Sequence, residues 1–216
     1  MERPEIIQST ATFVAGEFAS EGSGHDWFHI DRVCRMALRI GKTEGGDPFI
    51  IEMAALLHDL DDYKITGLES HVPEKAKSWL SSQNVEAEVA SLILQVIEEV
   101  SYKGSDVETP VSSVESAVVQ DADRLDAIGA IGIARTFAYG GHKNRLIYDP
   151  EIVPEMHDDF QSYKSSTAPT INHFYEKLLL LKDRMNTKTA KLMAAQRHLF
   201  MENYLQHFFD EWEAKG

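Results

Sequence analysis

Apolar residues recur at helical spacing along most of the chain. Over residues 85–100 they follow one another at intervals of three and four, which places them on one face of a helix. The same period predicts helices over residues 6–18, 28–40, 49–60, 112–138, 171–181 and 187–212, and Pro73 opens one more. No stretch shows the alternation of a half-buried strand. The pattern therefore predicts an all-α helical bundle.

Glycine and proline interrupt this pattern. We expect Gly41 to end the helix over 28–40, and Gly129 to mark a tight crossing or a break within 112–138. Residues 139–170 contain these two residue types too often for a long helix. Because a long irregular segment in a compact domain is often functional, we interpret 139–170 as a loop that forms a substrate-facing lid. A plain surface excursion is the alternative.

Length, charge and cysteine content limit the function. A chain of 216 residues suffices for one domain, and we expect a single domain over residues 1–216. The net charge of -14 repels polyanions such as duplex DNA, but a metal ion with one or two cations can still hold a small phosphate ester. The single cysteine, Cys34, excludes an intramolecular disulfide, and no apolar stretch is long enough to span a bilayer. We expect a cytoplasmic protein, and leave a homodimer formed through the late helices open.

Four side chains from distant parts of the chain form a candidate metal site. His58 and Asp59 directly follow the apolar run of residues 53–57. His29 lies on the apolar face of an earlier predicted helix, and Asp123 is in phase with Val119 on a later one. A buried carboxylate without a partner costs several kcal/mol or neutralises. Two carboxylates beside two imidazoles are therefore best explained by one bound divalent cation.

The donor types restrict the identity of this cation. Imidazole suits Zn, Cu, Fe and Ni, whereas carboxylate and water suit Mg and Mn. The mixed set predicts one divalent transition metal ion. We expect Mn, with Fe, Co, Ni, Zn or Mg as alternatives.

Three stretches carry a resemblance to a known family: HDWFHIDRV (25–33), AALLHDLDDYK (54–64) and QDADRLDAIGAIG (120–132). In this order they resemble the H…HD…D motif of the HD-domain metal-dependent phosphohydrolase superfamily, and in particular the small bacterial HD hydrolases similar to nucleotide pyrophosphohydrolases. The resemblance implies an all-helical HD domain that hydrolyses a phosphoanhydride or phosphoester of a nucleotide. It also implies that the metal ligands are His29, His58, Asp59 and Asp123; Asp121 and Asp126 flank the last of these and stay open as replacements.

Four further side chains are candidates for catalysis and substrate binding. Asp62 follows His58 by one helical turn, if the helix continues, and can orient the attacking water or move its proton. Arg32, Lys64 and Lys103 can bind phosphate oxygens of the substrate. The alternatives are a solvated carboxylate for Asp62 and ordinary surface cations for the other three.

Other functions compete with nucleotide pyrophosphate hydrolysis. The same attack by water on phosphorus serves a phosphodiesterase or a phosphomonoesterase. A non-catalytic nucleotide-sensing HD module would keep the same helical fold. The i, i+4 pair of His25 and His29 is reminiscent of zinc proteases, but Asp26 is a poor substitute for their general base. The dipeptide His157-Asp158 follows no buried run, and we interpret it as unrelated to the site. Cys34 has no activating base nearby in the sequence and is interpreted as an inert thiol.

Overall fold

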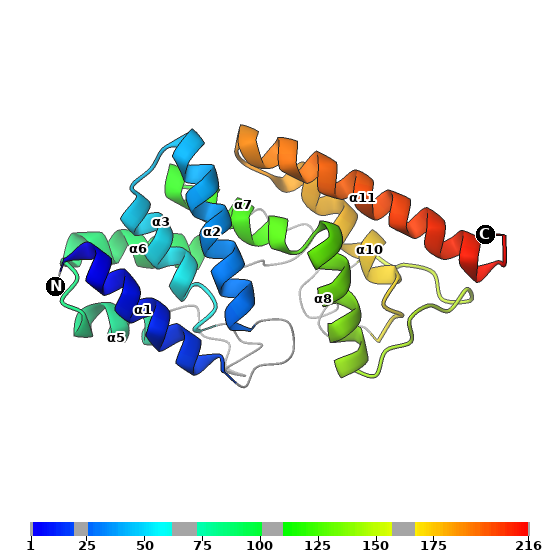
Figure 1. Cartoon of the computed structure of the whole chain (residues 1–216), viewed down its shortest axis with the longest axis horizontal. Coiled ribbons are helices and arrows are strands. Elements are labelled where there is room, and N and C mark those ends of the chain that lie inside the picture. Colours follow the sequence, from blue (N-terminus) through cyan, green and yellow to red (C-terminus); the bar gives the residue numbers. More distant parts are fainter. Residues whose placement is uncertain (1, 20–25, 62–72, 101–109, 157–166, 216) are drawn as a thin grey trace. The chain divides into compact units, whose positions relative to one another are not determined.

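The computed structural model describes residues 2–19, 26–61, 73–100, 110–156 and 167–215 (Figure 1). Every regular element within these ranges is a helix, which confirms the predicted all-α fold. None of these helices is long and apolar enough to cross a lipid bilayer. The chain divides into two compact units, the first formed by residues 1–103 and 108–123, the second by residues 104–107 and 124–216. The single domain over 1–216 stays a prediction.

Helix α3 (Pro48–Leu57) forms the centre of the first unit. Pro48 occupies the first turn of α3, where its missing N–H costs nothing, and Asp47 caps this end through the N–H of Phe49. From Phe49 to Leu57 every residue except Glu52 is buried. Helix α3 packs against three others: α1 (Arg3–Glu17), α2 (Trp27–Glu44) and α6 (Ala87–Val100). Helix α5 (Glu74–Ser82) packs on α6. The residues of α3 that precede His58 are therefore held on all sides by apolar contacts.

Gly41 lies inside α2 and does not end it, because the helix continues to Glu44. The prediction of a helix end at Gly41 is wrong. A Cβ atom at position 41 would lie 2.7 Å from Cδ1 of Ile51, so the glycine belongs to the contact between α2 and α3. A close approach of two helices, and not a chain turn, explains this glycine.

The predicted break near Gly129 is confirmed. Helix α7 (Val114–Asp126) ends three residues before Gly129, which adopts φ +77° and starts α8 (Gly129–His142). A positive φ of this size suits glycine and is costly for other residues. The single helix predicted over residues 112–138 is therefore two helices, and the helical face of Asp123 ends with α7 at Asp126.

The second unit is built on α11 (Lys188–Trp212), which packs against α8 and against the 3-10 helix η1 (Leu178–Arg184). Thr187 caps α11 by accepting a hydrogen bond from the N–H of Ala190 (3.2 Å). The single helix predicted over 171–181 is instead two short elements, α10 (Asn172–Glu176) and η1. They separate at Lys177, whose φ of -144° is incompatible with a continuous helix.

The irregular segment begins later than predicted, because α8 continues through Gly140 and Gly141 to His142. After α8 the chain is anchored to a segment further on. The N–H of Thr170 donates to the carbonyl of Leu146 (2.8 Å), and the N–H of Ile171 donates to that of Ile147 (3.0 Å). Residues 157–166 lie outside the described part of the chain, so the lid stays a prediction.

Candidate metal centre

The first turn of α2 positions His29. Asp26, directly before the helix, caps it by accepting a hydrogen bond from the backbone N–H of His29 (2.8 Å). The side chain of His29 is fully buried. Its Nε2 atom points toward two carboxylates, 3.4 Å from Oδ2 of Asp59 and 3.5 Å from Oδ1 of Asp123. The cap thus fixes the backbone from which this imidazole reaches the carboxylates.

His58 lies directly after the last residue of α3, and its ring is oriented by the helix it follows. Nδ1 of His58 lies 2.8 Å from the carbonyl oxygen of Ala55. A carbonyl only accepts hydrogen bonds, so the proton belongs on Nδ1 and a lone pair on Nε2. Among the described residues Nε2 has no hydrogen-bond partner although it is buried. A buried imidazole nitrogen with a lone pair and an oriented ring is a typical metal ligand.

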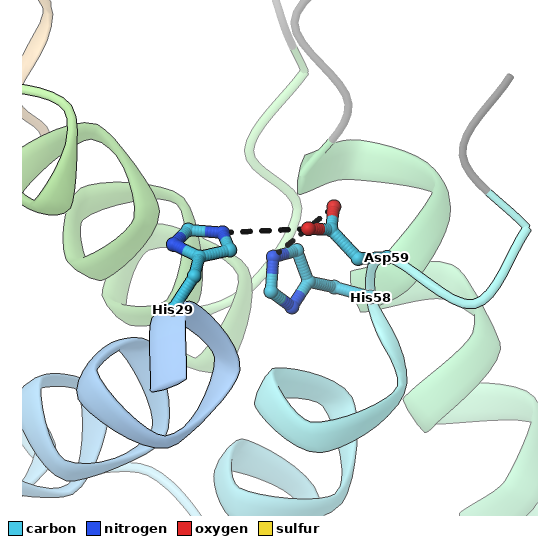
Figure 2. Close-up of side chains that lie close together, drawn as sticks. All are labelled: His29, His58 and Asp59. Atoms are coloured by element: carbon cyan, nitrogen blue, oxygen red, sulfur yellow. Dashed lines mark ion pairs between the residues drawn. The ribbon is translucent and has the colours of Figure 1, made fainter. Parts of the chain in front are cut away.

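The carboxylate of Asp59 faces both imidazoles (Figure 2). Its Oδ1 lies 3.4 Å from Nε2 of His58. Its Oδ2 lies 3.4 Å from Nε2 of His29. The ligand atoms of these three buried residues all lie within 4.8 Å of one another. These separations exceed the usual length of a hydrogen bond between charged groups, about 2.7–2.9 Å. The three atoms therefore surround a common point without binding each other tightly.

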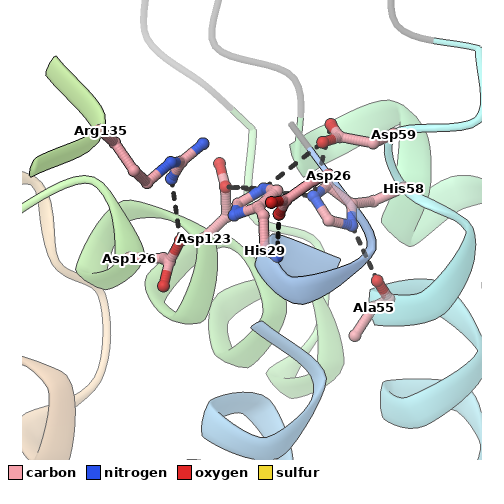
Figure 3. A network of polar contacts seen from close by, with 8 residues as sticks. All are labelled: Asp26, His29, Ala55, His58, Asp59, Asp123, Asp126 and Arg135. Atoms are coloured by element: carbon pink, nitrogen blue, oxygen red, sulfur yellow. Dashed lines mark hydrogen bonds and ion pairs between the residues drawn. The ribbon is translucent and has the colours of Figure 1, made fainter. Parts of the chain in front are cut away.

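Asp123 on α7 is the fourth member of the group (Figure 3). Its Oδ1 lies 3.5 Å from Nε2 of His29 and 4.0 Å from Nε2 of His58, and its side chain is 31% exposed. The side chains of the other three residues are almost inaccessible to solvent, so Asp123 marks the side of the group that is open to solvent. The group therefore meets solvent at Asp123.

The flanking aspartates have other surroundings. Asp126, in the second unit, accepts a hydrogen bond from Arg135 (2.9 Å). Asp121 is fully buried. Asp123 lies within ion-pair distance of both imidazoles and stays the predicted fourth ligand.

The separations between imidazole nitrogens and carboxylate oxygens in this group fit one metal ion. Donor atoms that share an octahedral ion at about 2.1 Å lie about 3 to 4.2 Å apart. The imidazole–carboxylate distances of 3.4, 3.5 and 4.0 Å fall within this range. Imidazoles and carboxylates also supply the mixed donors that suit divalent transition metals.

Of the other predicted site residues, only Arg32 falls within the described residues. It lies on α2, one turn after His29, and is partly buried. Asp62, Lys64 and Lys103 lie outside the described residues, so their roles stay predictions.

Two contacts that position the histidines of the group were not predicted from the sequence. The cap by Asp26 had a signal, because an aspartate directly before an apolar helical face is a common N-cap. The contact between His58 and the carbonyl of Ala55 had none, since it depends on the backbone conformation at the end of α3.

Two neighbouring features play no part in the group. Cys34 on α2 is free and buried, and burial raises the pKa of its thiol to about 12, which agrees with the predicted inert thiol. The surface hollows of the first unit lie on both sides of the stacked rings of Phe13 and Trp79, and none of the four candidate ligands lines them.

Comparison with known proteins identifies the family. The model of the HD domain matches residues 27–128, which contain all four candidate ligands. YpgQ of Bacillus subtilis (strain 168) is 40% identical over 208 residues, 95% of this chain and 93% of YpgQ. The crystal structure of a HD-superfamily hydrolase from Bacillus thuringiensis has 46% identity and a TM-score of 0.75, over 98% of this chain and 99% of its own. The crystal structure of YpgQ in complex with ADP has 37% identity and a TM-score of 0.75, over 95% of this chain and 97% of its own. The chain therefore belongs to the HD superfamily of metal-dependent phosphohydrolases.

Proposed function

We propose that this protein hydrolyses a phosphoanhydride bond of a nucleotide, as a pyrophosphohydrolase, with one Mn²⁺ ion held by His29, His58, Asp59 and Asp123. The convergence of these four side chains carries the proposal. The complex of the related YpgQ with ADP supports a nucleotide substrate. The net charge of -14 favours a small phosphorylated molecule over a nucleic acid. We place the reaction in the cytoplasm, since the one cysteine suits a reducing compartment.

A divalent ion in this site lowers the pKa of a coordinated water and polarises a phosphoryl oxygen. The chain's own residues prepare the site for such an ion. The carbonyl of Ala55 accepts the hydrogen bond of Nδ1 of His58, so that Nε2 faces the ligand position. The buried Asp59 supplies negative charge where water does not screen it, and the partly exposed Asp123 forms the side from which substrate approaches.

Three cations and one carboxylate complete the proposal. Arg32 is proposed to bind phosphate oxygens through its planar guanidinium, and Lys64 and Lys103 as point charges. Asp62 is proposed to orient the attacking water and to accept its proton. The proton leaves the water as its oxygen binds the α-phosphorus, and the leaving pyrophosphate takes the electron pair of the broken P–O bond.

A panel of nucleoside mono-, di- and triphosphates, cyclic nucleotides and dinucleotides with Mn²⁺ tests this function. Ion chromatography of the products separates the candidates. A nucleoside monophosphate and pyrophosphate from a triphosphate support the proposal, whereas a nucleoside and orthophosphate from a monophosphate indicate a phosphomonoesterase. Cleavage of cyclic or dinucleotide substrates alone indicates a phosphodiesterase.

A nucleotide-sensing module is the second candidate, and the complete set of candidate ligands is compatible with it. Isothermal titration of the same panel distinguishes it from an enzyme. Tight nucleotide binding without turnover, in protein shown by elemental analysis to be loaded with metal, would contradict the proposed hydrolysis.

A further inference from the structure

Helix α5 begins without a capping side chain of its own. Its N-cap residue is Pro73, which has no side-chain acceptor for the N–H groups of the first turn. The missing acceptor comes from Asp61, 14 residues earlier: the N–H of Lys75 donates to Oδ1 (3.1 Å) and that of Ala76 to Oδ2 (3.2 Å). These are the second and third residues of α5, the positions that an N-cap side chain normally serves. Asp61 therefore replaces the cap from a distant point of the chain.

This contact lies two residues beyond Asp59. The intervening residue, Leu60, is 2% exposed, and its N–H donates to the carbonyl of Leu57 (3.2 Å). On the other side of Asp59, the ring of His58 is tied to the carbonyl of Ala55. The short segment that carries both candidate ligands is thus anchored before and after Asp59.

The other contact at the start of α5 is weaker. Nζ of Lys75 lies 3.4 Å from Oε2 of Glu17, but these side chains are 50% and 42% exposed. Exposed pairs of this kind contribute little, because water and salt screen them. The carboxylate of Asp61 accepts two backbone hydrogen bonds at the positive end of a helix dipole, so it is the stronger anchor.

We propose that Asp61 is a positioning residue for the metal centre: by binding the first turn of α5 it holds the turn of residues 58–61 and thereby directs Asp59 toward His29. This inference rests on the proposed metal site. It assigns Asp61 no contact with metal or substrate.

Mn²⁺ binding to the full-length, metal-stripped protein tests the inference without reference to activity. Calorimetry and the electron paramagnetic resonance signal of free Mn²⁺ give the dissociation constant. We expect Asp61→Ala to weaken Mn²⁺ binding by about 10- to 100-fold, the usual range when a residue that orients a metal ligand is lost. Asp61→Asn keeps one acceptor oxygen and should recover part of this loss.

Thr187→Ala is the matched control, because it removes a helix cap from α11 in the second unit. Both alanine variants should lower Tm, by about 2–4 °C per lost cap. Only Asp61→Ala should change the affinity for Mn²⁺. A dissociation constant for Asp61→Ala equal to that of the wild type would overturn the inference. If Asp61→Ala does not fold, the same criterion applies to Asp61→Asn.

Two further measurements separate this inference from the proposed function. Asp59→Ala tests the metal site itself. If Asp59→Ala no longer binds Mn²⁺ but Asp61→Ala binds it with the affinity of the wild type, only the positioning role of Asp61 is refuted. A wild-type protein that binds no Mn²⁺ would refute both. Hydrogen exchange of the amides of Lys75 and Ala76 reports the cap directly, and faster exchange in Asp61→Ala is expected with or without metal.

Discussion

The first unit contains two polar clusters, each built around a buried carboxyl group, that differ in the partners of that group. One is the candidate metal centre of His29, His58, Asp59 and Asp123. The other, which we call the Glu99 cluster, consists of Gln95, Glu99, Ser112, Ser116 and Gln120. In the Glu99 cluster Oε2 accepts from the N–H of Ser112 (3.0 Å) and Oε1 from Nε2 of Gln95 (3.4 Å). Gln120 donates to the carbonyls of Glu99 (2.7 Å) and Pro110 (2.8 Å).

The two clusters also differ in how the surroundings of their carboxyl groups act on the charge. Burial alone raises the pKa of the Glu99 carboxyl, but hydrogen bonds from Ser116, Ser112 and Gln95 outweigh burial and leave this pKa below its ordinary value. In the metal centre, carboxylate oxygens face imidazole nitrogens at 3.4 to 4.0 Å, too far for strong hydrogen bonds. A cluster satisfied by donors holds the fold together, whereas a cluster of acceptors around a common point is suited to a cation.

The largest effect is expected from Asp59→Ala, which removes the buried carboxylate that faces both imidazoles. Mn²⁺ affinity and nucleotide turnover should both fall by more than about 100-fold. Loss of a residue that only supports a metal ligand costs up to about 100-fold, and loss of the ligand itself should cost more. Circular dichroism should show that helical content is retained. Glu99→Gln is the control, because it disturbs the other cluster and should keep Mn²⁺ bound. Turnover by metal-stripped Asp59→Ala would contradict the assignment.

Metal addition should stabilise only proteins with an intact centre. Mn²⁺ at 100 times its dissociation constant should raise the free energy of unfolding by about 2.7 kcal/mol. Urea denaturation with Mn²⁺ and with EDTA measures this gain. It should be present in the wild type and in Glu99→Gln and absent in His58→Ala. An equal gain in His58→Ala would place the bound ion elsewhere.

Glu99→Gln should reduce the free energy of unfolding at pH 7 by about 1–3 kcal/mol, the usual cost of leaving buried groups poorly paired. The pH dependence has a definite sign, because the pKa of Glu99 is lower in the folded than in the unfolded chain. The stabilisation is complete above the ordinary value of 4.5 and is lost as pH falls through the lower folded pKa. Urea denaturation at pH 7 and pH 3 should therefore show a smaller acid loss for Glu99→Gln than for the wild type.

The smallest effect is expected at Cys34, a buried polar group that belongs to neither cluster. With a pKa of about 12 its thiol stays protonated at pH 8, so iodoacetamide should not react with the folded protein. Mass spectrometry should find alkylation only after unfolding in urea. Rapid alkylation of the native protein would show that this part of α2 opens readily.

Helical phase and motif order predicted that His29, His58 and Asp59 lie close together. The apolar faces that contain His29 and His58 are local properties of two helices, and both residues are buried as expected. The same reasoning failed beyond Asp126, because a helical face ends where the helix ends, and the positive φ of Gly129 is visible only in the structure.

The contacts that support the centre were not predictable in this way. Asp61 binds residues 14 and 15 positions later, and Gln120 binds the carbonyl of Glu99, 21 positions earlier. Such pairs depend on how the chain returns to itself between helices, which hydrophobic periodicity does not encode. The late start of the irregular segment has a related cause: Gly140 packs against Thr170, so tertiary contact keeps two consecutive glycines helical.

Gly41 lies on α2 far from the candidate ligands. It lies 12 residues after His29, more than three turns along α2, where a Cβ atom would meet the terminal methyl group of Ile51 on α3. A larger residue at position 41 would therefore require the Ile51 side chain to move. The missing side chain at position 41 thus leaves room for Ile51 in the contact between the helix that carries His29 and the helix that His58 follows.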